Sequence, residues 1–147
     1  MILLDANILI YASIESFPQH AASRAWLEES FGQPTQVGLP WPSLLGFIRI
    51  VTNPRILSTP TSTRTAWTRV EQWLSRPNAW IPSPTDRHRS VLSKLLGEDV
   101  RGDLVPDAHL AALAIEHGLT VCSTDGDFAR FADVRWENPL ATIDPTP

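Results

Sequence analysis

Apolar residues along the chain gather in short runs that are separated by longer segments with helical spacing. The first run has no polar alternation and ends at Asp5, which is typical of a strand buried on both faces. Four further segments resemble it: QVGLP (36–40), NAWIP (78–82), LTVCS (119–123) and VRW (134–136). We therefore predict five short strands, the first over residues 1–5.

Helical segments occupy the stretches between these runs. The first is expected from Asn7 to Ser16, and Pro18 allows a second that stops at Gly32. Further helices are predicted over 43–51, 62–75, 85–97 and 106–118, and a short one within 124–131. Because strands and helices alternate throughout, the pattern predicts an α/β fold with a mostly parallel sheet between helix layers.

Two helices carry particular signals. In the segment 106–118, Pro106 suits a first helical turn and Gly118 suits the stop, so this is the clearest helix of the chain. In the segment 62–75, Trp67, Val70 and Leu74 recur at helical spacing. We expect these three side chains to form its buried face.

Length and composition favour a single domain over residues 1–147, with 43% hydrophobic and 19% charged residues. One cysteine, Cys122, excludes a disulfide within the chain and fits a reducing compartment. The start lacks the basic segment of a signal peptide, and no apolar run approaches the ~20 residues of a membrane span. We therefore expect a cytoplasmic protein with no membrane segment.

The formal net charge is −4, which by itself argues against a nucleic-acid partner. Phosphate groups require local positive charge on the protein that binds them. The objection weakens if several acids are gathered to hold metal ions, because bound cations reverse the local field. The position of the acids in the fold therefore decides the matter.

Three aspartates are predicted to meet at one edge of the sheet. Asp5 ends the first strand, and Asp125 follows the strand LTVCS. Asp107 lies in the first turn of the helix that precedes that strand, so it should start at the same carboxyl edge, where open parallel sheets bind ligands. Asp127 begins the next short helix and can share the edge.

Carboxylates held this close repel one another and raise each other's pKa unless something neutralises them. A hard divalent cation with oxygen ligands is the natural neutraliser, and such an ion can activate water for attack on a phosphodiester. Each aspartate also has a simpler interpretation as a helix cap or as a partner of a helix dipole. The coincidence of four acids on one edge favours the metal site.

Five ordered segments carry a resemblance to a known family. LLDANILIYA, LPWPSLLGFIRIVTNPRIL, PDAHLAALAIEHG, STDGDFARF and RWENPL resemble the PIN-domain ribonucleases of VapC type, the toxins of type II VapBC toxin–antitoxin modules. The resemblance covers nearly the whole chain. It implies a PIN-like three-layer domain and an endoribonuclease that uses Mg²⁺ or Mn²⁺ to hydrolyse RNA through metal-activated water. It also implies a homodimer inhibited by a VapB-type antitoxin.

The resemblance assigns roles residue by residue. Asp5, Asp107 and Asp125 match the catalytic and metal-binding acids of the family, and Asp127 matches an accessory acid. Thr124 matches the hydroxyl residue that often precedes the last of these acids.

Two more residues are accessory candidates, and one position departs from the family. Asn7 is expected to orient the first acid, and Arg49 could meet RNA phosphate or pair with an acid of the site. The family usually has a Glu on the helix after the second strand, whereas this chain has Gly46 in that place. Asp103 could compensate or be a plain loop acid, so the number of metal ions stays open.

Two other functions remain as alternatives. A phosphatase with Asp5 as nucleophile usually has a second Asp two residues later and a nearby lysine, but this chain has Asn7 there and only one lysine, Lys94. The second alternative is a catalytically inert PIN fold, disabled by the missing Glu, that binds RNA or a partner. His109 and His117 are eight residues apart with no nearby cysteine, which does not make a zinc site.

Overall fold

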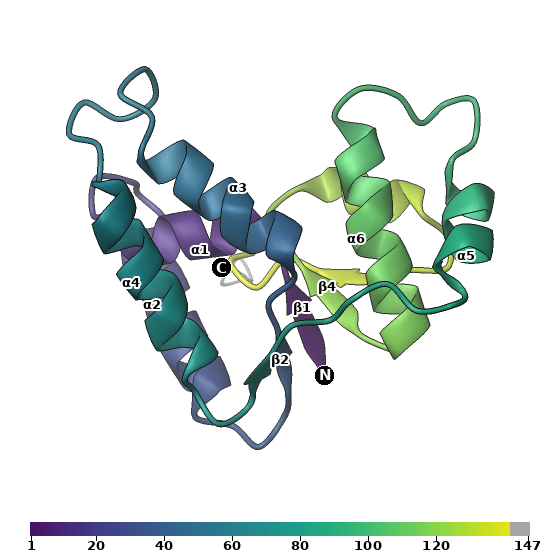
Figure 1. Cartoon of the computed structure of the whole chain (residues 1–147), viewed down its shortest axis with the longest axis horizontal. Coiled ribbons are helices and arrows are strands. Elements are labelled where there is room, and N and C mark those ends of the chain that lie inside the picture. Colours follow the sequence, from purple (N-terminus) through teal and green to yellow (C-terminus); the bar gives the residue numbers. More distant parts are fainter. Residues whose placement is uncertain (142–147) are drawn as a thin grey trace, which may run out of the picture.

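The chain folds around a five-stranded sheet, described for residues 1–141 by a computed structural model (Figure 1). The strands are β1 (Ile2–Leu4), β2 (Val37–Gly38), β3 (Ala79–Trp80), β4 (Thr120–Cys122) and β5 (Arg135–Glu137). They lie in the order β3-β2-β1-β4-β5, and every neighbouring pair is parallel. The predicted α/β fold with a parallel sheet is confirmed.

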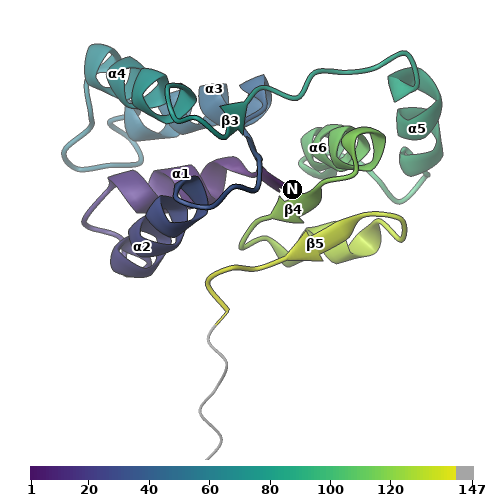
Figure 2. The same ribbon diagram turned by 90° about the horizontal axis from the view of Figure 1, so that it is seen from below.

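Helical crossovers connect the strands, as parallel pairing requires. Within the described residues they are α1 (Ala6–Ser13), α2 (His20–Phe31), α3 (Trp41–Val51), α4 (Thr63–Leu74), α5 (His88–Leu95), α6 (Leu104–His117) and the 3-10 helix η1 (Gly126–Arg130). Figure 2 shows α1 to α4 on one side of the sheet and α5 and α6 on the other. No helix of residues 1–141 has both the length and the apolarity needed to cross a membrane.

A hydrophobic core lies on each face of the sheet. Leu4 of β1 is fully buried in the core that includes Phe47 and is formed largely by α1 to α4. Its neighbour Leu3 is fully buried in the other core, which includes Phe128 and is formed largely by α6 and the η1 region. Burying each side chain of this size contributes roughly 1.5–3 kcal/mol. The central strand β1 is thus held from both sides, and its carboxyl end has a fixed position.

The predicted buried face of α4 is partly wrong. Val70 is buried as expected, but its buried partners are Ala66 and Trp73, whereas Trp67 and Leu74 are only partly buried. The apolar residues of this helix cover more than one face, so spacing alone did not say which face would be innermost. The structure places the Trp73 ring in the core, which leaves Trp67 near the surface.

The helix predicted over 85–97 begins three residues later, at His88. The reason is a long-range contact that local signals cannot show. The backbone N–H and the hydroxyl of Thr85 both donate to Glu116 Oε1, at 2.9 and 2.6 Å. Thr85 therefore anchors the chain to α6 before α5 starts.

Candidate functional site

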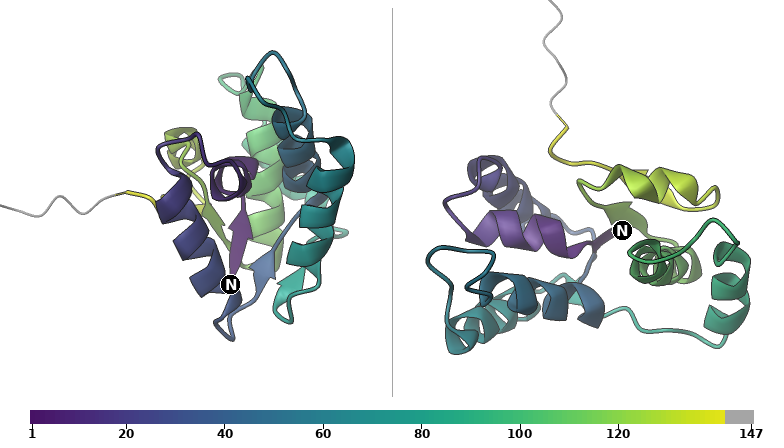
Figure 3. Two further views of the ribbon diagram at one scale, coloured as in Figure 1. Left: turned by 90° about the vertical axis from the view of Figure 1, so that its left-hand side faces the viewer. Right: turned by 90° about the horizontal axis from the view of Figure 1, so that it is seen from above.

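The carboxyl ends of β1 and β4 lie side by side, because the two strands pair with Leu4 opposite Cys122. Asp5 follows β1 directly, Asp125 stands just beyond β4, and Asp107 lies in the first turn of α6. The right-hand view of Figure 3 looks down on this edge, where the starts of α1, α3 and α6 gather. From β1 the chain first adds β2 and β3 on one side and then β4 and β5 on the other side. Ligands usually bind at such a switch point in parallel sheets, which here lies between β1 and β4.

Asp5 has two kinds of contact. As the N-cap of α1, its Oδ1 accepts a hydrogen bond from the Ala6 N–H at 2.8 Å. Its Oδ2 accepts from the Ser123 hydroxyl at 2.7 Å and from the Asn7 side-chain amide at 3.4 Å. The cap interpretation is therefore correct but incomplete, since the same carboxylate is also tied to the end of β4.

Ser123 connects the acids at this edge and was not singled out from the sequence. Its buried hydroxyl donates to Asp5 and accepts from the Asn7 amide and from the backbone N–H of Asp125, both at 3.0 Å. The backbone N–H of Thr124 donates to Asn7 Oδ1 at 3.4 Å. The Asn7 side chain thus contacts Asp5, Ser123 and the backbone of Thr124. A serine directly after a strand whose end carries an acid was the available signal for Ser123.

Three carboxylates form a compact cluster. Asp107, Asp125 and Asp127 each offer one oxygen, and these atoms lie within 4.8 Å of one another. Asp125 Oδ1 accepts the backbone N–H of Asp127 at 2.9 Å, and Arg130 pairs with Asp127 at 3.6 Å. Asp127, expected to be accessory, is thus a full member of this cluster, whereas Asp5 lies outside it.

The electrostatics connect Asp5 to the cluster nonetheless. Burial and, to a smaller extent, the charges of Asp5, Asp125, Asp127 and Asp103 together raise the pKa of Asp107 to about 7. Burial also raises the pKa of Asp5, although the hydrogen bonds from Ser123 and Ala6 oppose it. Within residues 1–141, Arg130 pairs with Asp127, but Asp5 and Asp107 have no ion-pair partner, so burial and neighbouring charges favour the protonated form of both.

The donor set fits a hard divalent cation. Every ligand candidate in the cluster is a carboxylate oxygen, the type that Mg²⁺ and Mn²⁺ prefer, and the cluster contains no imidazole or thiolate. A bound cation would also relieve the repulsion that raises the pKa of Asp107. Cys122 is not a competing reactive group, because burial raises the pKa of its thiol.

The three remaining candidates are Gly46, Arg49 and Asp103. Gly46 packs against the start of α1, and a Cβ atom placed on it would lie 3.3 Å from the Ala6 Cβ, so a larger residue would crowd that contact. Arg49 is exposed in the last turn of α3, and no acid of residues 1–141 forms an ion pair with it. Asp103 is exposed at the N-cap of α6, where its charge contributes to the raised pKa of Asp107.

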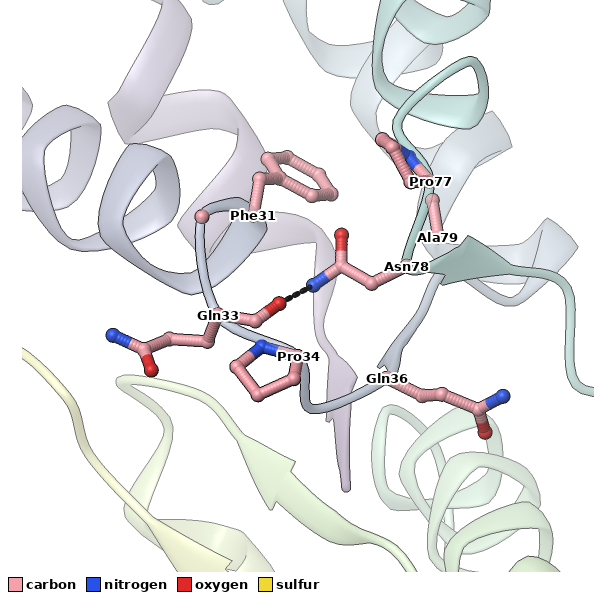
Figure 4. A pocket seen from close by; sticks show the side chains of 8 residues that line it. Phe31, Gln33, Pro34, Gln36, Pro77, Asn78 and Ala79 are labelled. Atoms are coloured by element: carbon pink, nitrogen blue, oxygen red, sulfur yellow. Dashed lines mark hydrogen bonds between the residues drawn. The ribbon is translucent and has the colours of Figure 1, made fainter.

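A hollow of ≈ 600 Å³ lies at the opposite edge of the sheet, between the end of α2 and the start of β3 (Figure 4). Its lining includes Phe31, Pro34 and Asn78 but no acid, base or nucleophile. The Asn78 amide donates to the carbonyl oxygens of Gln33 and Thr35 at 2.9 and 2.8 Å, which holds the loop before β2. This hollow therefore lacks the chemistry found at the acidic edge.

Comparison with known proteins agrees with this geometry. The model of the PIN domain family matches residues 2–134. The chain is 41% identical over 141 residues to Ribonuclease VapC33 of Mycobacterium tuberculosis, which covers 95% of this chain and 99% of that protein. It is 40% identical to Ribonuclease VapC37 of the same species over 144 residues, 97% of this chain and 100% of that protein.

Solved structures share the fold at lower identity. VapBC2 from Rickettsia felis, bound to a promoter DNA fragment, matches with a TM-score of 0.69 and 21% identity, over 94% of this chain and 98% of that one. VapC20 of Mycobacterium tuberculosis, a toxin that cleaves the sarcin-ricin loop, matches with a TM-score of 0.65 and 20% identity, over 92% and 99%.

Fold, acidic edge and family match together define a PIN-domain protein. The chain belongs to the PIN-domain family and, within it, to the VapC ribonucleases. Nucleases with this domain generally depend on divalent metal ions, in keeping with the aspartate cluster.

Proposed function

We propose that this VapC ribonuclease is an endoribonuclease that hydrolyses RNA phosphodiester bonds with the help of Mg²⁺ or Mn²⁺. We further propose that it is the toxin of a type II toxin–antitoxin module, that it works as a homodimer and that a VapB-type antitoxin inhibits it. The observation that carries the proposal is the aspartate cluster beside Asp5, with its raised carboxyl pKa values.

Asp5, Asp107 and Asp125 would hold the ion, with Asp127 as a fourth oxygen donor. When bound, a divalent ion of this kind stabilises charge on the phosphate and makes water a better nucleophile at neutral pH. Asp127 brings a further carboxylate into the cluster, which thus has three candidate oxygen donors besides Asp5 although Gly46 stands where the family usually has a Glu.

The chain's own residues prepare this site before any ion arrives. Ser123 and Asn7 hold Asp5 Oδ2, while the Ala6 N–H holds Oδ1, so the orientation of this carboxylate is fixed by three donors. Asp125 is fixed on the other side of the same serine through its backbone N–H. Preorganised ligands lose little conformational freedom on binding, which favours the ion and its correct position.

Asp107 controls the charge of the site. With a pKa of about 7 in the absence of an ion, its carboxyl group carries a proton in a substantial fraction of molecules at neutral pH. Ion binding requires the ionised form, so it should release this proton and become tighter as pH rises towards 8.

The substrate and partner proposals rest on the relatives. VapC20 is a toxin that cleaves the sarcin-ricin loop, and another structural neighbour is a toxin–antitoxin complex from Klebsiella pneumoniae. For this chain we propose RNA as the substrate, with Arg49 as a phosphate contact since no acid of the described residues pairs with it.

The test is incubation of the protein with total cellular RNA in the presence of Mg²⁺, Mn²⁺ or EDTA, followed by mapping of new 5′ ends. New ends at defined positions should appear with either metal, vanish with EDTA and vanish in an Asp5→Asn variant. The matched control is Glu29→Gln, which removes an exposed acid of α2 and should cut like the wild type. Metal-independent cutting, or cutting by Asp5→Asn, would contradict the proposal. No cutting under any condition would favour the inert RNA- or partner-binding PIN fold.

A further inference from the structure

Positive charge is concentrated in one part of this acidic protein. Residues 33–85, which comprise β2, α3, α4 and β3, contain five arginines and a single acid, Glu71, although the whole chain has a net charge of −4. Within residues 1–141, only Arg76 of these five forms an ion pair, with Glu28 of α2 at 3.1 Å. The other four are Arg49, Arg55, Arg64 and Arg69. They remain available for an anionic partner.

Two tryptophans stack on the same part of the surface. The rings of Trp41 in α3 and Trp67 in α4 are nearly parallel, with an interplanar angle of 7° and a centroid separation of 6.4 Å. Trp41 is 40% exposed, and Leu45, one turn further along α3, is 56% exposed. Large aromatic groups left this exposed are suited to a flat ligand or to a partner surface.

A hollow of ≈ 310 Å³ opens beside this pair, between α3 and α4. Its walls are the Trp67 ring and the aliphatic side chain of Ile48, and Thr63 and Arg64 add a hydroxyl and a guanidinium group. Aromatic rings and arginine planes are the groups on which nucleic-acid bases stack. The chemistry of the hollow thus matches a base attached to a phosphate backbone.

The stacked pair connects this hollow to the acidic edge. α3 begins at Trp41, three residues after the end of β2, so it starts at the same edge of the sheet as Asp5. Further along α3, a Cβ atom on Gly46 would lie 3.3 Å from the Ala6 Cβ, so this helix passes beside the neighbour of Asp5. Ile48 lies seven residues along α3, which corresponds to about 10 Å. An RNA strand leaving the aspartates could therefore pass Trp41 and reach the hollow within a few nucleotides.

We infer that the hollow formed by Ile48, Thr63, Arg64 and Trp67 binds a nucleobase of the RNA substrate at a distance from the cut, with Trp41 lining the path to the aspartates. The inference rests on the proposed ribonuclease function. Arg64 favours RNA over a protein partner as the occupant, because it has no ion-pair partner within residues 1–141 and supplies positive charge beside the Trp67 ring. The subsite would give a VapC ribonuclease of net negative charge a place to hold its anionic substrate.

The experiment measures binding of a labelled, unstructured 12-nucleotide RNA. All proteins carry Asp5→Asn so that the RNA is not cleaved during the measurement. A 12-mer with the same backbone but without bases is measured in parallel. Trp67→Leu keeps apolar volume but removes the stacking surface, and it should weaken binding of the intact RNA by about 10-fold while leaving the abasic RNA unchanged. Arg64→Gln should weaken both by about 2- to 3-fold and flatten the salt dependence by about one phosphate contact. Arg89→Gln, an exposed arginine of α5, is the control and should change neither.

Unchanged RNA affinity in both Trp67→Leu and Arg64→Gln would overturn the subsite, and so would an equal loss for intact and abasic RNA in Trp67→Leu. A change of oligomeric state in sedimentation, without a change in RNA affinity, would instead mark this face as a protein contact and also overturn it. If Trp67→Leu unfolds in a melting control, Arg64→Gln decides. Wild-type protein is tested for RNA cleavage with Mn²⁺ in parallel. If it does not cleave RNA, the proposed function fails. If it cleaves RNA but the two variants bind RNA as tightly as their background does, only the subsite is overturned.

Discussion

Two acids of the same helix, α6, show opposite electrostatic behaviour. Glu116 near its end has a side chain with no exposed surface, and burial alone would raise its pKa, but hydrogen bonds from Thr85 and His88 lower it below its ordinary value. Asp107 in the first turn is only partly buried, yet burial raises its pKa and the charges of neighbouring acids raise it further, to about 7, with no hydrogen bond that opposes the rise. A carboxylate whose hydrogen bonds are satisfied stabilises the fold, whereas one placed among like charges marks a site that awaits a cation.

Cleavage should separate the two acids most strongly. Asp107→Asn keeps the shape of the side chain but removes a candidate metal ligand, so RNA cleavage should fall by about 100- to 1,000-fold. Glu116→Gln should leave the cleavage rate of the folded protein within about 2-fold, because no metal ligand is lost. Initial rates with Mn²⁺ below the melting temperature of each variant provide the comparison. Equal losses in the two variants would contradict the assignment of roles.

For stability we expect the opposite order, with Glu116 more important than Asp107. Glu116→Gln replaces an acceptor of several donors and leaves the Thr85 and His88 groups poorly paired, which should cost about 3 kcal/mol of unfolding free energy. Urea unfolding at pH 7 measures this loss. The matched variant Glu98→Gln removes an exposed acid after α5 and should change stability by less than about 0.5 kcal/mol. If Glu116→Gln leaves the free energy of unfolding unchanged, this hydrogen-bond network does not stabilise the position of α5.

Ser123→Ala tests whether the Ser123 hydroxyl positions the aspartates of the acidic edge. Loss of the hydroxyl frees Asp5 Oδ2 and the backbone N–H of Asp125 from a shared partner, so cleavage should fall by about 10-fold. The loss should be smaller at saturating Mn²⁺, since the aspartates themselves remain. If Ser123→Ala cleaves RNA at the wild-type rate at every Mn²⁺ concentration, Ser123 has no role in the site.

The pH dependence of stability gives the smallest effect. A raised carboxyl pKa means that the folded, metal-free protein binds protons more tightly than the unfolded chain between about pH 4 and 7. Its stability should therefore fall as pH rises through that window, and Asp107→Asn should lack this part of the loss. Because Asp107 is partly exposed, we expect the variant to gain only about 1 kcal/mol at pH 8 and nothing at pH 4. Melting in EDTA at several pH values measures the difference.

The acidic edge could be predicted from sequence because its parts obey short-range rules. Asp5 and Asp125 follow apolar strands, and Asp107 lies in the first turn of a helix with clear start and stop signals. Parallel pairing then brings these ends together. The resemblance to VapC ribonucleases pointed to the same acids.

Other features depended on contacts that no local pattern contains. Ser123 bonds to Asp5 across 118 positions of the chain, and Glu116 reaches Thr85 across 31. The buried face of α4 was misjudged because both Trp67 and Trp73 fit a helical stripe, and only packing against α3 selects Trp73. Tertiary contacts of this kind override local spacing.

The most direct test of the central claim is calorimetric titration of the wild-type protein with Mn²⁺ near pH 7, repeated in two buffers of different ionisation enthalpy. The account predicts binding at the aspartate cluster with net proton release, which Asp107→Asn abolishes together with most of the affinity and Glu116→Gln leaves unchanged. Absence of Mn²⁺ binding by the wild type, or undiminished binding by Asp107→Asn, would contradict it.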